Sequence, residues 1–377
     1  MAGGGSNSEY RKFGRRGLPI SDRQAVIGQF LTAAGWGQAD YKPLAGDASY
    51  RRYARLSSGT ARAILMDAPP GGDAPKQHAA REYNAVAHLA VDCAPFVAVA
   101  RYLAQSGFSA PRILAGDMAA GLLLLEDFGD ALYFDLFAQG QAELPLYGAA
   151  IDLLLALHSR PLPALLPETP YCPAYRVPGF DQAAVQAELA LMLDWYLPDQ
   201  GRDASAAARR EFEDIWDALY PHFASGPEVL VLRDYHAQNI FWLPDRAGLQ
   251  QVGIIDFQDA LRGSAAYDLV SLLEDARRDV APELASNMLA RYCEGARRSQ
   301  PDFDVDGFHL ACAIAGVQRN TRLLGTFTRL ARRDGKMFYL GLIPRVRRYL
   351  ERALAHPHPQ LQSLQCWMAA HLPPADG

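Results

Sequence analysis

Residues 229–259 read V-L-V-L-R-D-Y-H-A-Q-N-I-F-W-L-P-D-R-A-G-L-Q-Q-V-G-I-I-D-F-Q-D. An apolar run at 229–232 leads into a polar segment, and two further apolar runs flank a turn at 244–248. Short apolar runs separated by turn-forming residues are typical of β-strands. The stretch therefore predicts a strand, a loop and a hairpin, with the carboxylate of Asp256 at the end of the hairpin.

Three oxygen-bearing side chains in this stretch have the spacing that phosphoryl transfer from ATP requires. Asp234 and Asn239 share the predicted loop, and Asp256 follows on the neighbouring hairpin. The reaction needs a residue that orients the acceptor hydroxyl and ligands for the metal that neutralises the triphosphate. Mg²⁺ prefers a few protein oxygens together with phosphates and water. The pattern assigns Asp234 as the catalytic base, and Asn239 and Asp256 as metal ligands, although each is also an ordinary turn or strand-end residue.

The same residues resemble the catalytic loop and D-F-G segment of protein kinases, and more closely those of the aminoglycoside phosphotransferase family. Arg233, Asp234 and Asn239 match R-D-x-x-x-x-N, and residues 254–257 match the hydrophobic-hydrophobic-D-F entry. Gln258 replaces the usual glycine. The resemblance implies an α+β, bilobal protein-kinase-like fold, with an N-terminal antiparallel five-stranded sheet lobe and a mainly helical C-terminal lobe. It also implies ATP and Mg²⁺ as the nucleotide and the metal.

The order of apolar and turn segments sets the expected domain limits. We expect a disordered tail at 1–20, an N-terminal lobe at 21–127 and a helical C-terminal lobe at 128–377. The C-terminal lobe would carry the catalytic loop at 232–239 and the metal segment at 254–259. A helix beginning at Ala94 is expected to pack behind the sheet, because its apolar residues recur at helical spacing.

The predicted N-terminal lobe also holds the candidate nucleotide-binding residues. A turn of small residues between two strands can lie over phosphates and offer backbone N–H groups. Kinases usually end the third strand with a phosphate-binding lysine, but Met66 stands there, so we expect an arginine to supply the charge. Backbone groups after the fifth strand would bind the adenine edge, unless this segment is a plain charged turn. The candidates are Gly46, Asp47, Ala48, Ser49, Arg51, Arg52, Glu126 and Phe128.

Composition limits the classes of partner. The 377 residues include 37 basic and 42 acidic side chains, which gives a net charge of −5 and no general reason to expect nucleic acid. The five cysteines are scattered and lack C-x-x-C spacing, which indicates a reducing compartment. No apolar run approaches the roughly 18–20 residues of a membrane span, and the N-terminus lacks the apolar core of a signal peptide. We therefore expect a cytoplasmic protein, with no membrane and no protein partner indicated.

Longer motifs narrow the resemblance to one branch of the family. They include G-D-A-S-Y-R-R-Y at 46–53, L-M-D-A-P-P at 65–70, L-D-W-Y-L-P at 193–198 and Q-R-N at 318–320. They resemble bacterial amino-sugar kinases that phosphorylate the C1 hydroxyl of N-acetylmuramate and N-acetylglucosamine in peptidoglycan recycling. Members of this branch also lack the third-strand lysine, so Met66 is compatible with activity.

The predicted C-terminal lobe offers polar residues for binding the sugar and for bracing the catalytic loop. Sugars are usually held by planar polar side chains, and an arginine suits a carboxylate through a bidentate pair. We expect Asp268, at the start of a helix, to brace the catalytic loop as its counterpart does in the kinase fold. The sugar-binding candidates, each of which is alternatively a packing or surface residue, are Arg176, Glu188, Asp194, Gln318 and Arg319.

Three other functions remain open from the sequence. An aminoglycoside, a choline-like amine or another small alcohol would be a different acceptor on the same fold. The methionine at position 66 also allows a nucleotide-binding pseudokinase. A protein kinase is disfavoured, because no A-P-E signature follows Asp256.

Overall fold

A computed structural model describes residues 20–44, 51–69 and 78–373. The chain forms two compact units. Among the described residues, the first unit contains 20–44, 51–69, 91–93 and 113–127, and the second contains 78–90, 94–112 and 128–373.

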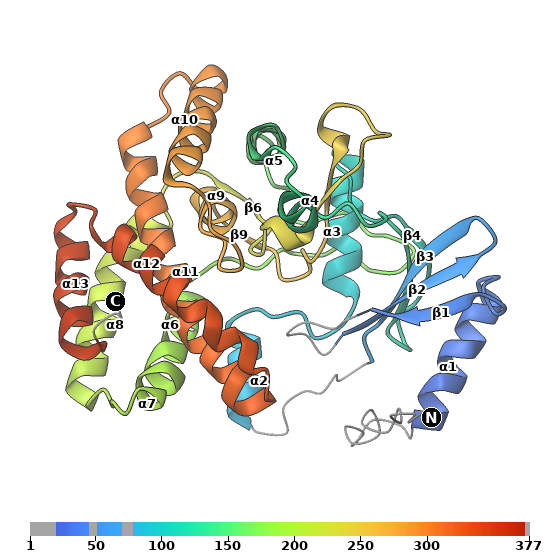
Figure 1. Cartoon of the computed structure of the whole chain (residues 1–377), viewed down its shortest axis with the longest axis horizontal. Coiled ribbons are helices and arrows are strands. Elements are labelled where there is room, and N and C mark those ends of the chain that lie inside the picture. Colours follow the sequence, from blue (N-terminus) through green and yellow to red (C-terminus); the bar gives the residue numbers. More distant parts are fainter. Residues whose placement is uncertain (1–19, 45–50, 70–77, 374–377) are drawn as a thin grey trace, which may run out of the picture. The chain divides into compact units, whose positions relative to one another are not determined.

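The first unit is an antiparallel sheet with one helix (Figure 1). Its elements are α1 (Ile20–Ala33), β1 (Asp40–Pro43), β2 (Arg52–Ser58), β3 (Ala61–Asp67), β4 (Ile113–Asp117) and β5 (Leu122–Glu126). The five strands lie in the order β1-β2-β3-β5-β4, and every neighbouring pair is antiparallel. The predicted five-stranded antiparallel sheet is confirmed.

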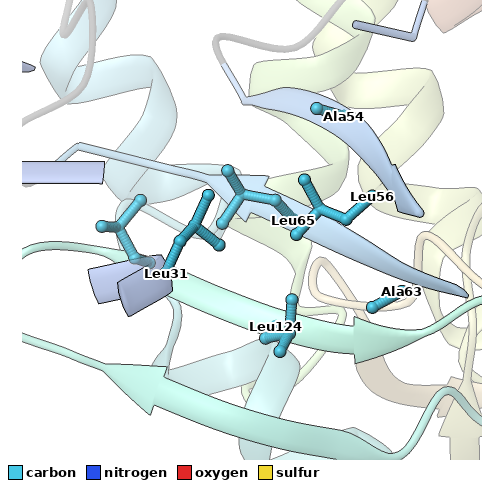
Figure 2. Packing of buried hydrophobic residues seen from close by; sticks show 7 residues of the cluster. Leu31, Ala54, Leu56, Ala63, Leu65 and Leu124 are labelled. Atoms are coloured by element: carbon cyan, nitrogen blue, oxygen red, sulfur yellow. The ribbon is translucent and has the colours of Figure 1, made fainter. Parts of the chain in front are cut away.

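The core of this unit follows from alternation along the strands. Side chains two positions apart point to the same face of a sheet, so Leu56 of β2, Leu65 of β3 and Leu124 of β5 meet on one face. Figure 2 shows these leucines with Leu31, which α1 contributes to the same cluster. Burying such side chains stabilises the unit by about 1.5–3 kcal/mol each. Met66, the next residue on β3, is also fully buried.

The second unit holds residues 229–259, here called the catalytic stretch, and most of the helices (Figure 1). Its helices before the catalytic stretch are α2 (His78–Val86), α3 (Ala94–Gln105), α4 (Tyr133–Ala138), α5 (Glu143–His158), α6 (Gln182–Leu191), the π-helix η2 (Met192–Tyr196), α7 (Leu197–Asp199) and α8 (Ala206–Phe223). The catalytic stretch and its surroundings form β6 (Glu228–Val231), the 3-10 helix η3 (Ala237–Asn239), β7 (Ile240–Trp242), the 3-10 helix η4 (Gly248–Gln251), β8 (Val252–Ile254) and β9 (Leu261–Ser264). The remaining helices are α9 (Ala266–Leu273), α10 (Pro282–Ser299), α11 (Val305–Asp334), the 3-10 helix η5 (Met337–Leu342), α12 (Ile343–Leu354) and α13 (Pro359–His371).

Strand pairing in the second unit agrees with the pattern of the catalytic stretch. β7 and β8 form the predicted antiparallel hairpin, and β6 pairs with β9. In the described part of the chain, no helix is both long enough and apolar enough to cross a bilayer.

Helix α3 belongs to the second unit, and its packing behind the sheet of the first unit remains a prediction. Its contacts group it with the second unit, where Phe96 stacks on Phe257 with ring centroids 5.0 Å apart. Phe257 directly follows the predicted metal ligand Asp256, so α3 supports the metal segment. The domain limits at 21–127 and 128–377 remain a prediction.

A close helix contact shapes the region around α6. Helix α6 gives way to the π-helix η2 at Met192. A Cβ on Gly325 of α11 would lie 2.1 Å from the backbone carbon of Leu191. Only glycine permits this approach, which brings the backbones of α11 and α6 together.

Candidate active site

The backbone of the catalytic loop is held by one buried carboxylate. Asp268, at the start of α9, accepts hydrogen bonds from the amides of Leu232 at 2.7 Å and Arg233 at 2.9 Å. Ser271 donates to the carbonyl of Arg233 at 3.1 Å. Arg233 has a φ of 72°, a conformation that costs about 1–3 kcal/mol in a non-glycine residue. These hydrogen bonds hold the turn before Asp234. They are consistent with the expected bracing role of Asp268, which remains a prediction.

Replacing Asp268 by alanine is expected to lower the free energy of unfolding by about 2–5 kcal/mol, because two buried amides lose a charged acceptor. Urea denaturation followed by circular dichroism would measure the change. Asp214→Ala, on the exposed face of α8, is the control and should change the free energy by less than about 0.5 kcal/mol. An Asp268→Ala protein as stable as the unsubstituted one would contradict the bracing role.

The three predicted reaction residues converge through Asn239. Its side-chain nitrogen donates to the backbone carbonyl of Asp234 at 2.9 Å and to Oδ2 of Asp256 at 3.2 Å. The carbonyl of Asn239 accepts from the amide of Ile255 at 3.1 Å, which joins the loop to the hairpin strand. The residue predicted to orient the acceptor and the two predicted metal ligands therefore lie within one small region of the second unit.

Gln258 supports the candidate metal segment. Its side-chain nitrogen donates to Oδ1 of Asp256 at 2.8 Å, and the side chain is buried. Asp256 has a φ of 62°, so its backbone adopts a conformation that L-residues rarely take. Gln258, which replaces the glycine of the kinase pattern, thus orients the Asp256 carboxylate.

The donor set of Asn239 and Asp256 fits Mg²⁺. A carboxylate and an amide supply hard oxygens, and both side chains are already in contact. Mg²⁺ is commonly bound by one or two protein groups together with substrate phosphates and water. The two side chains would therefore hold the metal only as part of a nucleotide complex.

Charges around Asp234 are predominantly positive. Burial alone would raise the pKa of Asp234, but the nearby charges, that of Arg322 foremost, bring it below the ordinary value. The nearest charge is the Arg322 guanidinium, whose Nη2 lies 3.6 Å from Oδ1 of Asp234. The Asp234 side chain remains 31% exposed, so the carboxylate is ionised at neutral pH and open to a ligand.

His236, within the catalytic loop, is a neutral residue. Burial and the charge of Arg277 lower the pKa of His236 to about 4. The Nη1 atom of Arg277 lies 3.2 Å from Nε2 of the ring. A neutral imidazole therefore accepts from Arg277 at neutral pH and adds no positive charge beside Asp234.

The five sugar-binding candidates divide into buried and exposed residues. Glu188, Gln318 and Arg319 are at most 1% exposed. Gln318 donates to Glu188 at 2.7 Å, and Arg319 donates to the carbonyl of Glu274 at 3.1 Å. Glu188 and Gln318 are thus hydrogen-bonded to each other in the protein interior, and their burial argues against direct contact with a sugar.

The two exposed candidates lie elsewhere on the second unit. Asp194 in η2 is half exposed, and its Oδ1 lies 2.8 Å from Nη1 of Arg209. Arg176 is exposed in the segment before α6. Their assignment to the sugar remains a prediction.

The candidate nucleotide-binding residues are only partly described. Gly46, Asp47, Ala48 and Ser49 lie outside the described residues. Arg51 and Arg52 belong to the first unit. Arg51 is buried, whereas Arg52 is exposed and its Nε lies 3.3 Å from Oδ2 of Asp67. The role of either arginine toward phosphate remains a prediction.

Glu126 and Phe128 flank the point where the chain passes from one unit to the other. Glu126 ends β5, whereas Phe128 belongs to the second unit. The Phe128 ring packs edge-on against Phe241 at 5.7 Å, and the Arg246 guanidinium lies 5.1 Å from its centroid. The Phe128 side chain is thus held within the second unit, and the expected backbone contact with adenine remains a prediction.

Sequence reasoning missed Arg322 as a site residue. It lies on α11 one helical turn after Arg319, which was a candidate. Residues three positions apart on a helix share a face, so the pair Arg319 and Arg322 was a usable signal.

Comparison with known proteins agrees with this geometry. The sequence profile of the phosphotransferase enzyme family matches residues 40–302. The chain is 40% identical to the N-acetylmuramate/N-acetylglucosamine kinase of Caulobacter vibrioides, over 94% of this chain and 98% of that protein. It is 35% identical to the kinase of the same name from Pseudomonas aeruginosa, over 90% of this chain and 92% of that protein. The structure of choline kinase LicA from Streptococcus pneumoniae has a TM-score of 0.54 and 13% identity, and the match covers 88% of this chain and 99% of that one.

The match to the family profile and the relatives named as kinases show a phosphotransferase, and the structural neighbours show that its fold is kinase-like. The likeness to choline kinase extends to the fold alone, because the identity is low. The chain belongs to the phosphotransferase enzyme family, whose profile covers most of its length.

Proposed function

We propose that the protein phosphorylates the anomeric C1 hydroxyl of N-acetylmuramate and N-acetylglucosamine, with ATP as donor and Mg²⁺ as cofactor. The main structural support for phosphoryl transfer is the pair of hydrogen bonds that the Asn239 side chain donates to the Asp234 backbone and to the Asp256 carboxylate. The acceptor rests on the names of relatives that are 40% and 35% identical over most of the chain. A place in peptidoglycan recycling and in the cytoplasm follows as part of the same proposal.

Asp234 acts on the acceptor hydroxyl. Its carboxylate accepts the hydroxyl proton as the bond between the sugar oxygen and the γ-phosphorus forms. The bond between the γ-phosphorus and the bridging oxygen breaks, and ADP leaves with that oxygen. Because a hemiacetal hydroxyl is more acidic than an ordinary alcohol, Asp234 contributes mainly orientation. Mg²⁺, held by Asn239 and Asp256, would neutralise charge on the phosphates.

The charges beside Asp234 favour an acidic or neutral acceptor over a polycation. Arg322 lies against the base, and Glu188, the other carboxylate that Arg322 contacts, is fully enclosed by the protein. An aminoglycoside carries several positive charges and would be repelled by the Arg322 guanidinium beside the base. A choline-like acceptor meets the same repulsion.

The pseudokinase alternative is weakened by the reaction residues. The base and both metal ligands are present and in contact through Asn239. Met66, which raised this alternative, is a buried residue of the sheet.

Incubation with ATP, Mg²⁺ and a panel of sugars, followed by phosphorus NMR, tests the proposal. The expected product is a sugar 1-phosphate, formed from N-acetylmuramate and from N-acetylglucosamine. A phosphate at position 3 or 6, or turnover of an aminoglycoside or choline alone, would move the assignment to another acceptor. Binding of ATP without turnover of any acceptor would favour the pseudokinase.

A further inference from the structure

Arg322 lies between two carboxylates in the second unit. Its Nη1 is 3.4 Å from Oε1 of Glu188, and its Nη2 is 3.6 Å from Oδ1 of Asp234. The Arg322 side chain is 11% exposed, Glu188 is not exposed at all, and Asp234 is 31% exposed. One guanidinium therefore joins an enclosed carboxylate to the open carboxylate that acts as base.

Glu188 is a fixed anchor for this guanidinium. It accepts from Arg233 of the catalytic loop, from Gln318 of α11 at 2.7 Å and from Arg322 of the same helix. We call Glu188, Arg233, Gln318 and Arg322 the Glu188 network. A buried carboxylate with this many charged and polar partners has little freedom to move, since breaking a buried pair by removing one partner costs about 3–5 kcal/mol. The network connects α6, the catalytic loop and α11.

The Asp234 carboxylate has few such restraints of its own. Among the residues that the structure describes, Arg322 is the charged group within ion-pairing distance of it. The terminal torsion of an aspartate is broad and roughly two-fold, so an unrestrained carboxylate samples many orientations. A cation on Oδ1 selects one of them and leaves Oδ2 for another partner.

We propose that Arg322 is a positioning residue for phosphoryl transfer, which fixes the Asp234 carboxylate so that Oδ2 faces the acceptor hydroxyl, and that Glu188 anchors Arg322. This inference deepens the proposed function and rests on it for the identity of the acceptor. Arg322 acts through Asp234 and makes no bond to the reacting atoms.

Steady-state kinetics with two acceptors separate this role from binding of the substrate. N-acetylmuramate carries a lactyl carboxylate that N-acetylglucosamine lacks. Arg322→Gln should lower kcat by about ten- to a hundredfold with both sugars, because a small misplacement of a reacting group costs up to about a hundredfold. KM for each sugar should stay nearly constant. Arg322→Lys retains a cation and should recover part of kcat.

Arg332→Gln is the matched control. Arg332 lies on the exposed side of the same helix and pairs with Asp199. It should leave kcat and KM at wild-type values. Wild-type kcat in Arg322→Gln would overturn the proposal. A rise in KM confined to N-acetylmuramate would also overturn it, because Arg322 would then bind the acceptor carboxylate.

Double variants test whether Arg322 acts through Asp234. In an Asp234→Asn background, Arg322→Gln should cause no further loss of kcat, since the carboxylate that it positions is gone. A loss that multiplies the effects of the two single substitutions would contradict this route. Glu188→Gln should also lower kcat, because it weakens the anchor of Arg322. Wild-type kcat in Glu188→Gln would overturn the anchoring role.

If the protein phosphorylates neither sugar, the proposed acceptors are wrong. The contact between Arg322 and Asp234 can then still be tested by thermal unfolding of the single and double variants. The unfolding midpoint of the double variant should shift by less than the sum of the shifts in Arg322→Gln and Asp234→Asn, because the two side chains interact. If the shifts in the midpoint were additive, the two side chains would not interact, and the positioning role would be overturned.

Discussion

Replacing Asp234 by asparagine is expected to lower kcat by about a hundred- to ten-thousand-fold, the usual contribution of a positioned base. Asparagine has the size of aspartate, so the loop should keep its backbone contact with Asn239, which uses the Asp234 carbonyl. The charge that pairs with Arg322 and the oxygen that receives the proton are lost. Initial rates with saturating ATP and N-acetylglucosamine would measure the change.

Asp203→Asn controls for the loss of one negative charge. Asp203 is exposed in the segment between α7 and α8 of the same unit. Its replacement should leave kcat unchanged, and both variants should unfold in one cooperative transition. If Asp234→Asn turned over at the wild-type rate, Asp234 would not be the base.

The second large effect is expected at the metal segment. Asp256→Asn should lower turnover by about two to four orders of magnitude, because a bound metal supplies several kcal/mol of charge stabilisation and each 1.36 kcal/mol is a tenfold change in rate. The concentration of Mg²⁺ that gives half-maximal rate should rise, since a neutral amide is a weaker ligand than a carboxylate. Rates measured over a Mg²⁺ titration would separate the two effects.

Asp245→Asn is the matched control for the metal segment. Asp245 lies in the exposed connection between β7 and β8, the hairpin that leads to Asp256. It should change neither the rate nor its dependence on Mg²⁺. An Asp256→Asn protein with an unaltered Mg²⁺ titration would exclude this carboxylate as a ligand.

The sequence predicted that Asp234, Asn239 and Asp256 lie close together, because their spacing is a local property. A strand, a five-residue separation and a hairpin determine which side chains meet, and Asn239 does contact both partners. Asp268 was a candidate brace because of the resemblance to the kinase fold, and its carboxylate accepts hydrogen bonds from the amides of Leu232 and Arg233. The five-stranded sheet was predictable from apolar runs and turns.

The sugar-binding candidates were harder to assign. Glu188 and Gln318 have the polar character of a sugar site, but they lie 130 positions apart in the chain and hydrogen-bond each other in the interior. Arg322, three positions after Arg319, was not selected, although it is the residue beside Asp234. Polarity alone does not show whether a side chain faces a ligand or another buried side chain.

The sequence by itself indicated the class of reaction, which the family confirms, and it predicted which residues would carry that reaction, because motif spacing acts over a few residues of backbone. Only the tertiary structure decided that Glu188 is an enclosed anchor and that Arg322 reaches the base. That outcome depends on the approach of α6 and α11, which Gly325 permits by lacking a side chain. Burial is a property of which surfaces meet across the fold, and it follows from long-range packing that no local pattern records.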